Sequence, residues 1–292
     1  MGRGRRSESG QVAVLTALGL VAILGAAALT VDVGHSYAVR DHMQSVAAAA
    51  AMAGAQSLPS SSAAEQMAEH YLALNQATGS ASVSQDEVTA KVTGEVPFYF
   101  AEVLGFSGAT INVSATATKT PVGEASGVRP FGVTADGFVE DQDYTLKSGS
   151  GCGGNFGALA LGGNGASNYE NNIVQGYPSE LTVGEEVETE PGKIVGPTDA
   201  GVEQLIEQDP EATWETVQAG SPRLVVVPII TTPGNGKSTV TIEGFGLFFL
   251  ESVSDGDVTG RFLNYVSRPG QSAPSGSQDF GYDQVTLVSE SY

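Results

Sequence analysis

The longest apolar segment of the chain is an uncharged run of 21 residues, Gln11 to Val31, which ends at Asp32. A helix of that length spans about 31 Å at ~1.5 Å per residue, close to the ~30 Å hydrocarbon core of a bilayer. Small residues at 26–29 and from Ala47 onward are compatible with signal-peptide cleavage, but the run is longer than a typical signal-peptide apolar region. The pattern predicts a retained transmembrane helix over residues 11–31, with a cleaved signal peptide as the alternative.

The helical pattern continues without a breaker from Asp32 to about residue 58, where Pro59 and three serines end it. This stretch contains an alanine-rich tract that includes Ala47, Ala50 and Gly54. Side chains this small allow another helix to approach closely, although alanine is also the best helix former. We therefore expect a helical stalk over residues 32–58 whose small-residue face is either a packing surface or a plain stalk surface.

A small α+β head unit is predicted over residues 59–120. Its expected elements are a helix at 63–75, a strand at 87–96, a short aromatic helix at 97–104 and a strand at 110–118. In the first helix, Met67, Tyr71 and Leu74 recur at helical spacing, with Glu65 and Glu69 on the other side. These three apolar residues define the predicted apolar face of that helix.

The sequence becomes rich in glycine and asparagine after a boundary at 121–127, which predicts a second, β-rich domain over residues 121–268. Its expected elements are strands at 183–189, 224–231 and 238–242, an apolar segment at 245–250 and a helix at 199–207. The remainder, 269–292, is expected to be a flexible tail with a possible last strand at 285–288. The predicted fold class is α+β.

Charge is distributed unevenly about the apolar run. Arg3, Arg5 and Arg6 precede the run, whereas only Arg40 follows it closely. The positive-inside rule then places residues 1–10 in the cytoplasm as a short tail and the rest of the chain outside it. Beyond residue 10 the chain has 10 basic and 32 acidic residues, a balance of −22. This acidity argues against nucleic acid or anionic lipid headgroups as partners.

Chemistry-bearing residues are sparse. The three histidines are His35, His42 and His70, and the single cysteine, Cys152, lies in a glycine-rich run that indicates a turn. A histidine-dependent catalytic triad or zinc site in the second domain is therefore excluded. The residues 231–238 do not form a phosphate-binding loop, because position 231 is not glycine and a strand follows.

Acidic residues leave two chemical alternatives open. Asp136, Glu140, Asp141 and Asp143 are of the type used by glycoside hydrolases or calcium sites, but no calcium-binding loop motif occurs and nothing fixes their separation. Solvated loop carboxylates are the preferred interpretation. We expect no enzyme activity, no catalytic residues, no metal, no cofactor and no small-molecule substrate.

The first sixty residues resemble a known family. The segments 10–14 (GQVAV) and 31–37 (VDVGHSY), together with Arg40, Gln44 and the alanine tract, resemble the N-terminal segment of TadE/TadG-like Flp (tight adherence) pilus-assembly proteins over about residues 9–58. Segments such as 129–132 (RPFG) and 244–249 (GFGLFF) are similar to longer TadG-related members. One departure is Ala48, which stands where that family has an acidic residue.

The resemblance implies a single-pass cytoplasmic-membrane protein or minor pseudopilin with a structural or scaffolding role in pilus assembly. Its partners would be other Tad membrane proteins or pilins, contacted through the N-terminal helix. The candidate residues are four motif positions and three packing positions. They are Asp32, Gly34, Tyr37, Gln44, Ala47, Ala50 and Gly54.

Two questions remain open at the level of sequence. Gly10 and Gln11 fit a prepilin-peptidase cleavage position, but Leu15 replaces the glutamate usual at the fifth mature position, which favours an unprocessed anchor. The alternative function is a membrane-tethered module that binds cell-wall polysaccharide, with Tyr169, Tyr177 and Trp214 as stacking groups.

Overall fold

The structure, a computed structural model, describes residues 6–135, 143–146, 156–190, 194–234, 237–267, 270–274 and 276–291. Its fold is α+β, as the sequence predicts: a long N-terminal helix precedes mixed helices and sheets. The chain divides into two compact units. Unit 1 comprises residues 1–118 and 287–292, and unit 2 comprises residues 119–286. The two are described separately below.

Unit 1 begins with a single helix of 50 residues, α1 (Arg6–Ala55). The predicted transmembrane and stalk segments are therefore one continuous helix, because no proline interrupts residues 6–55 and alanine stabilises its second half. A turn follows at 56–59, so the helix ends three residues before the predicted position.

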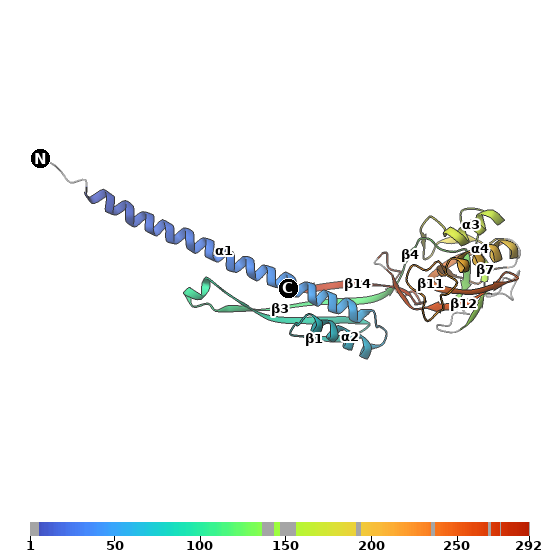
Figure 1. Cartoon of the computed structure of the whole chain (residues 1–292), viewed down its shortest axis with the longest axis horizontal. Coiled ribbons are helices and arrows are strands. Elements are labelled where there is room, and N and C mark those ends of the chain that lie inside the picture. Colours follow the sequence, from blue (N-terminus) through green and yellow to red (C-terminus); the bar gives the residue numbers. More distant parts are fainter. Residues whose placement is uncertain are drawn as a thin grey trace. The chain divides into compact units, whose positions relative to one another are not determined.

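The remaining elements of unit 1 are one helix, one short 3₁₀ turn and the strands of a sheet. They are α2 (Ser61–Leu74), β1 (Gly79–Ser84), β2 (Glu87–Pro97), η1 (Ala101–Leu104), β3 (Gly108–Pro121) and the end of β14 (Tyr282–Ser291). Strands β2 and β3 form a long antiparallel hairpin, in register from Glu87 opposite Thr118 to Pro97 opposite Gly108. Figure 1 shows this hairpin running alongside α1, and η1 lies at its tip.

The buried face of α2 differs from the predicted one. Ala64, Ala68 and Leu72 are buried, whereas Met67, Tyr71 and Leu74 are exposed, so the predicted apolar face is wrong. The reason is the closeness of α1 and α2: only alanine-sized side chains fit where the small-residue tract of α1 meets α2. Size complementarity outweighs hydrophobicity at this contact.

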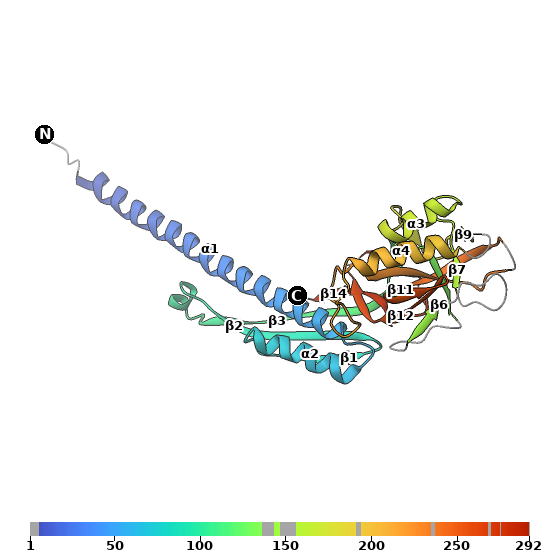
Figure 2. The ribbon, with the colours of Figure 1, turned by 45° about the vertical axis from the view of Figure 1, so that its right-hand side comes forward.

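Unit 2 contains two helices and a set of mostly short strands. They are β4 (Glu124–Ala125), β5 (Phe131–Thr134), β6 (Tyr144–Leu146), β7 (Phe156–Ala158), α3 (Ala166–Gln175), β8 (Leu181–Thr182), β9 (Glu186–Glu188), α4 (Val195–Glu207), β10 (Leu224–Ile230), β11 (Thr239–Ser254), β12 (Asp257–Leu263), β13 (Tyr265–Ser267) and most of β14. The main sheet has the order β6-β12-β11-β10-β5-β7, with β9 also paired to β11. Helices α3 and α4 pack together, and α4 covers β11 (Figure 2).

The core of unit 2 is built around this sheet. Tyr169 and Ile173 from α3, with Val202 and Leu205 from α4, join buried sheet residues in one hydrophobic cluster. A second cluster includes Val187 and Ile242. In β9, Val187 is buried between exposed Glu186 and Glu188, so this strand has the alternation that the sequence predicts.

Strands β10 and β11 pair antiparallel from Leu224 opposite Phe249 to Ile230 opposite Ile242, so the partners of the predicted strand 224–231 lie mostly in 244–249 and not in the predicted strand 238–242. The predicted apolar segment 245–250 belongs to β11 and is not a separate element. The sequence did not predict α3 or β12. The segment 269–292 contains the strand β14, which includes the possible last strand expected at 285–288 and is longer; its residues 287–291 belong to unit 1.

The guanidinium group of Arg223 is buried in unit 2 and is tolerated there because of its contacts. Its nitrogens donate to four backbone carbonyls, those of Asp209, Ala212, Leu250 and Glu251, and its guanidinium lies 4.6 Å from the centre of the Phe249 ring. A buried charge with this many acceptors stabilises the fold locally. Arg223 is therefore a structural residue.

Candidate functional site

Asp32 lies at the point where the uncharged run of α1 ends, and its side chain is only 2% exposed. Its carboxylate accepts hydrogen bonds from the backbone N–H groups of Tyr99 (2.8 Å), Phe100 (3.0 and 3.2 Å) and Ala101 (2.6 Å). These are the free amides that precede η1, so Asp32 acts as a cap supplied by a different element. The contact ties the tip of the β2–β3 hairpin to α1.

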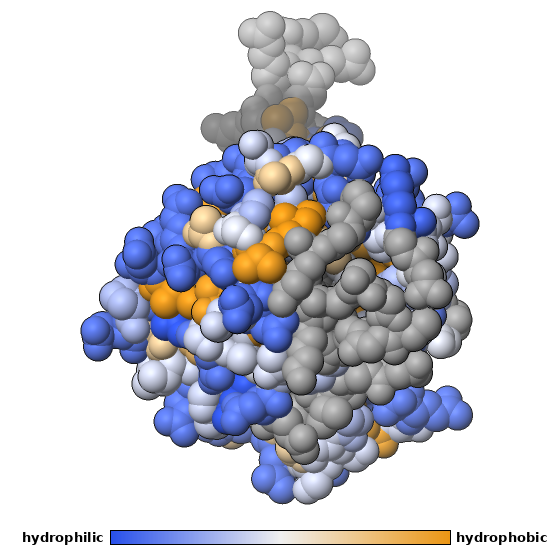
Figure 3. Space-filling model, turned by 90° about the vertical axis from the view of Figure 1, so that its right-hand side faces the viewer, coloured by the Kyte–Doolittle hydropathy of each residue, from blue (hydrophilic) through white to orange (hydrophobic). Residues whose placement is uncertain are grey.

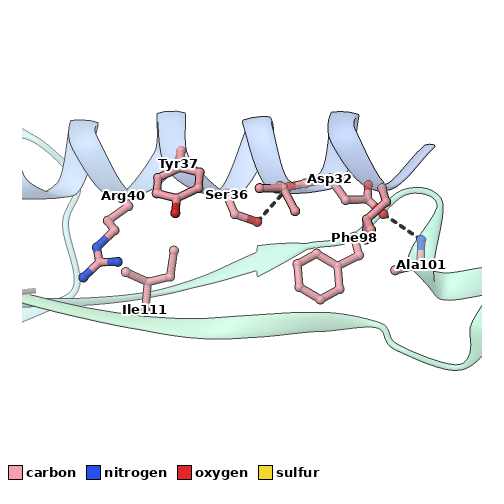
Figure 4. A pocket seen from close by; sticks show the side chains of 9 residues that line it. Asp32, Ser36, Tyr37, Arg40, Phe98, Ala101 and Ile111 are labelled. Carbon is pink, nitrogen blue, oxygen red and sulfur yellow. Dashed lines mark hydrogen bonds between the residues drawn. The ribbon is translucent and has the colours of Figure 1, made fainter. Parts of the chain in front are cut away.

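The same region contains a small, mainly apolar cavity of about 200 Å³. Residues of α1 line one side, and Phe98, Ala101 and Ile111 of the hairpin line the other (Figure 4). The Ser36 hydroxyl donates to the backbone carbonyl of Asp32 at 2.8 Å, so it is satisfied within the helix. Since the only carboxylate of the lining is fully engaged by amides, this cavity has the character of a packing gap and not of a reaction site.

Four further candidate residues lie where α1 meets the rest of unit 1. Ala47 and Ala50 are fully buried, and Gln44 donates from Nε2 to the Ser114 carbonyl of β3 at 3.2 Å. A Cβ on Gly54 would lie 2.7 Å from the Ala64 carbonyl oxygen and 2.9 Å from both Ala68 Cβ and Val88 Cγ1. The small-residue tract is thus a packing surface, and the helix that occupies it is α2 of the same chain.

Gly34 and Tyr37 are not brought into this contact. No atom lies within 4 Å of the position of a Cβ on Gly34, and Tyr37 is 67% exposed at the edge of the cavity. Gly10 and Gln11 are exposed on α1 as well. These four positions therefore lie outside the contact of α1 with α2, and Tyr37 among them lies at the edge of the cavity.

The sequence did not predict the partners of Asp32, which are backbone amides of a hairpin 67 to 69 residues away. A weak signal was available: an acidic residue at the end of an apolar run needs hydrogen-bond donors when buried, and the helical turn after Pro97 supplies free N–H groups. The predicted aromatic helix at 97–104 shortens to η1, because residue 97 still pairs in β2.

The predicted polysaccharide-stacking residues are not arranged for that role. Tyr169 is 1% exposed, its pKa is raised by burial, and its ring packs edge-on against Phe131, so its proposed role in stacking is wrong. One face of Trp214 is covered by the Arg261 guanidinium at 4.4 Å. Tyr177 is half-buried.

Within the described ranges, no group of three or more His, Cys, Asp or Glu side chains is arranged to hold a metal ion. Asp143 forms an ion pair with Arg261. Asp136, Glu140, Asp141 and Cys152, and part of the segment 231–238, lie outside the described residues.

Together these features define a class of protein: an α+β protein with one N-terminal apolar helix that is consistent with a single membrane anchor. That helix, within Gly10–Ala55, is the only one in the described part of the chain that is long and apolar enough to cross a membrane. Residues 10–57 match the family described as "Putative Flp pilus-assembly TadE/G-like", which confirms the resemblance inferred for residues 9–58. No curated protein and no solved structure matches the chain.

Proposed function

We propose that the protein is a single-pass, membrane-anchored scaffold of the Tad pilus-assembly machinery, similar to a minor pseudopilin and without catalytic activity. The observation that carries this proposal is the coincidence of the family match at 10–57 with an apolar helix whose side chains are exposed over residues 10–27. Val21 and Ile23, for example, are about 70% exposed. Such a surface requires lipid or other apolar helices around it.

The two parts of α1 have different surroundings, and this difference supports the proposed role. The C-terminal part is buried against α2 and β2 through Ala47, Ala50 and Gly54, whereas residues 10–27 are exposed throughout. Partner proteins in the membrane are therefore contacted through residues 11–31, and the small-residue tract serves folding. This revises the expectation that Ala50 and Gly54 face a partner.

A strain that carries the Tad system, with and without the gene, provides the test. Deletion is expected to reduce the number of Flp pili on the surface, and the full chain should restore it. A photo-crosslinking residue at Ile23 should then form adducts with Tad membrane proteins in intact membranes, and the same residue at exposed Glu69 on α2 should not. Normal piliation without the gene would contradict the proposal.

The intact mass of the chain from these membranes separates two versions of the role. A chain that retains residues 2–10 is a permanent anchor, which the leucine at position 15 favours. A chain that starts at Gln11 is a processed subunit able to enter a filament. Both masses are compatible with a role in Tad assembly. The longer chain would carry out that role as a membrane anchor, and the shorter one could carry it out within a filament.

A further inference from the structure

The tip of the β2–β3 hairpin exposes a cluster of large apolar side chains, which we call the aromatic tip: Tyr99, Phe100, Val103 and Phe106. Val103 is 88% exposed and Phe106 is 63% exposed. Four large apolar groups within eight residues would be costly to leave in water, and aromatic rings are the side chains most enriched at membrane surfaces.

The hydrogen bonds of Asp32 fix where the aromatic tip lies along α1. The amides of Tyr99, Phe100 and Ala101 are held at 2.6–3.2 Å from the carboxylate of the residue that directly follows the apolar run. Leu29, one helical turn inside the run, lines the same cavity as Phe98 and Ala101. Figures 1 and 2 show the hairpin reaching toward the N-terminal half of α1, with its tip the part furthest in that direction.

From this geometry we infer that the aromatic tip inserts into the membrane surface and forms a second contact with the bilayer beside the helix. The tip contacts the boundary between lipid headgroups and acyl chains, because it lies beside the end of the helical segment that enters the membrane. The inference rests on the proposed membrane anchor.

The contact is apolar in character. The only charged residues from 92 to 118 are Glu95 and Glu102, so the tip carries no lysine or arginine for anionic headgroups. Burial of ring surface and a position at the headgroup level supply the attraction instead. The tip contains Glu102 and no basic residue, so anionic lipid should not strengthen the contact.

Tryptophan fluorescence of the full chain in lipid vesicles tests the inference. The chain has one tryptophan, and Trp214→Phe provides a background for single introduced tryptophans. In vesicles with brominated lipids, Phe106→Trp is expected to be quenched most by bromine close to the headgroups, at a depth of about 5–10 Å. Tyr71→Trp, on the exposed side of α2, should show no quenching.

Two further variants make the outcome decisive. Val21→Trp lies in the apolar run and reports whether the anchor itself is in the bilayer. Quenching of Val21→Trp without quenching of Phe106→Trp or of Tyr99→Trp would overturn the aromatic tip as a membrane contact, including the case in which it binds a protein, and would leave the anchor intact. Absence of quenching at Val21→Trp would overturn both the anchor and the tip.

Discussion

Gly34 and Gly54 lie on the same helix in opposite surroundings. A methyl group on Gly34 meets no atom within 4 Å, whereas one on Gly54 would lie within 3 Å of atoms of α2 and β2. We expect Gly54→Ala to destabilise unit 1 by about 1–3 kcal/mol through overpacking, and Gly34→Ala to be neutral or stabilising by roughly 0.5–1 kcal/mol through helix propensity. Thermal unfolding of the full chain in detergent compares the two variants directly.

Equal effects of the two alanine substitutions would contradict the close contact of α1 with α2. The comparison is matched, because both changes add one methyl group to the same helix and both lie beyond the apolar run. Gly54→Leu should then abolish folding of unit 1, while an equally large side chain at position 34 should be tolerated.

Asp32 makes a second residue-level prediction. Asp32→Ala removes the acceptor for three backbone amides, and amides without a partner exchange their hydrogens faster. Hydrogen exchange at residues 99–101 should accelerate roughly 5- to 10-fold, as expected for the loss of one hydrogen bond per amide. Asp41→Asn, at an exposed position on the same helix, is the control and should leave these amides unchanged. Unchanged exchange in Asp32→Ala would show that the tip is held by other contacts.

The residues that sequence could single out were those whose own pattern is unusual: Asp32 after an apolar run, and Gly54 within an alanine tract. Their partners could not be predicted, since the contacts of Asp32 are backbone amides that carry no side-chain signal. The sequence left open whether the tract of α1 is a packing surface or a plain stalk surface, and it did not predict α2 as its occupant.

At the scale of elements, long periodic segments were predictable and close-packed faces were not. The helix α1 and the β10–β11 hairpin follow directly from apolar periodicity and turn residues. In α2, the hydrophobic ranking favoured Met67, Tyr71 and Leu74, but the space beside α1 admits only Ala64 and Ala68. The last strand expected at 285–288 is present as the longer β14, which follows a segment rich in proline, glycine and serine.

The strand β14 also contains a buried acid, Asp283, whose pKa is raised. Burial raises the pKa of Asp283 to about 6, nearby Asp279 adds to the rise, and Lys119 of β3, at 2.8 Å, opposes it. The folded state therefore holds this proton more tightly than the unfolded chain does. Its stabilising contribution is present below about pH 4 and is lost as pH rises toward and through 6.

We expect the free energy of unfolding to fall by roughly 1–3 kcal/mol more between pH 4 and pH 7 in the wild type than in Asp283→Asn. Denaturant titrations of the full chain in detergent at several pH values give this difference. Asp255→Asn is a suitable control, because Asp255 is exposed and asparagine tolerates its left-handed backbone, φ 55°. An identical pH profile for wild type and Asp283→Asn would contradict the raised pKa.

At the scale of the whole molecule, the excess of acidic residues acts together with the apolar helix. Beyond residue 10 the charge balance is −22, and the coloured residues in Figure 3 are mostly hydrophilic with small apolar patches. Such a surface is soluble and is repelled by anionic lipid headgroups. Membrane attachment therefore depends on apolar groups, namely the helix over residues 11–31 and, by our inference, the aromatic tip.

Orientation is the remaining property of the whole chain, and the basic residues around the helix determine it. Arg3, Arg5 and Arg6 should retain the N-terminus in the cytoplasm, so a fluorescent protein that folds only in the cytoplasm should stay dark when fused after Tyr292. Replacing the three arginines by glutamate and adding lysines at positions 41 and 42 should make a fraction of molecules fluorescent. Replacing the arginines by lysine should not, since the charge is retained. Fluorescence of the unaltered fusion would show that the acidic units face the cytoplasm. That result would contradict a role at the outer side of the membrane. It would not affect the fold or the Asp32 contact.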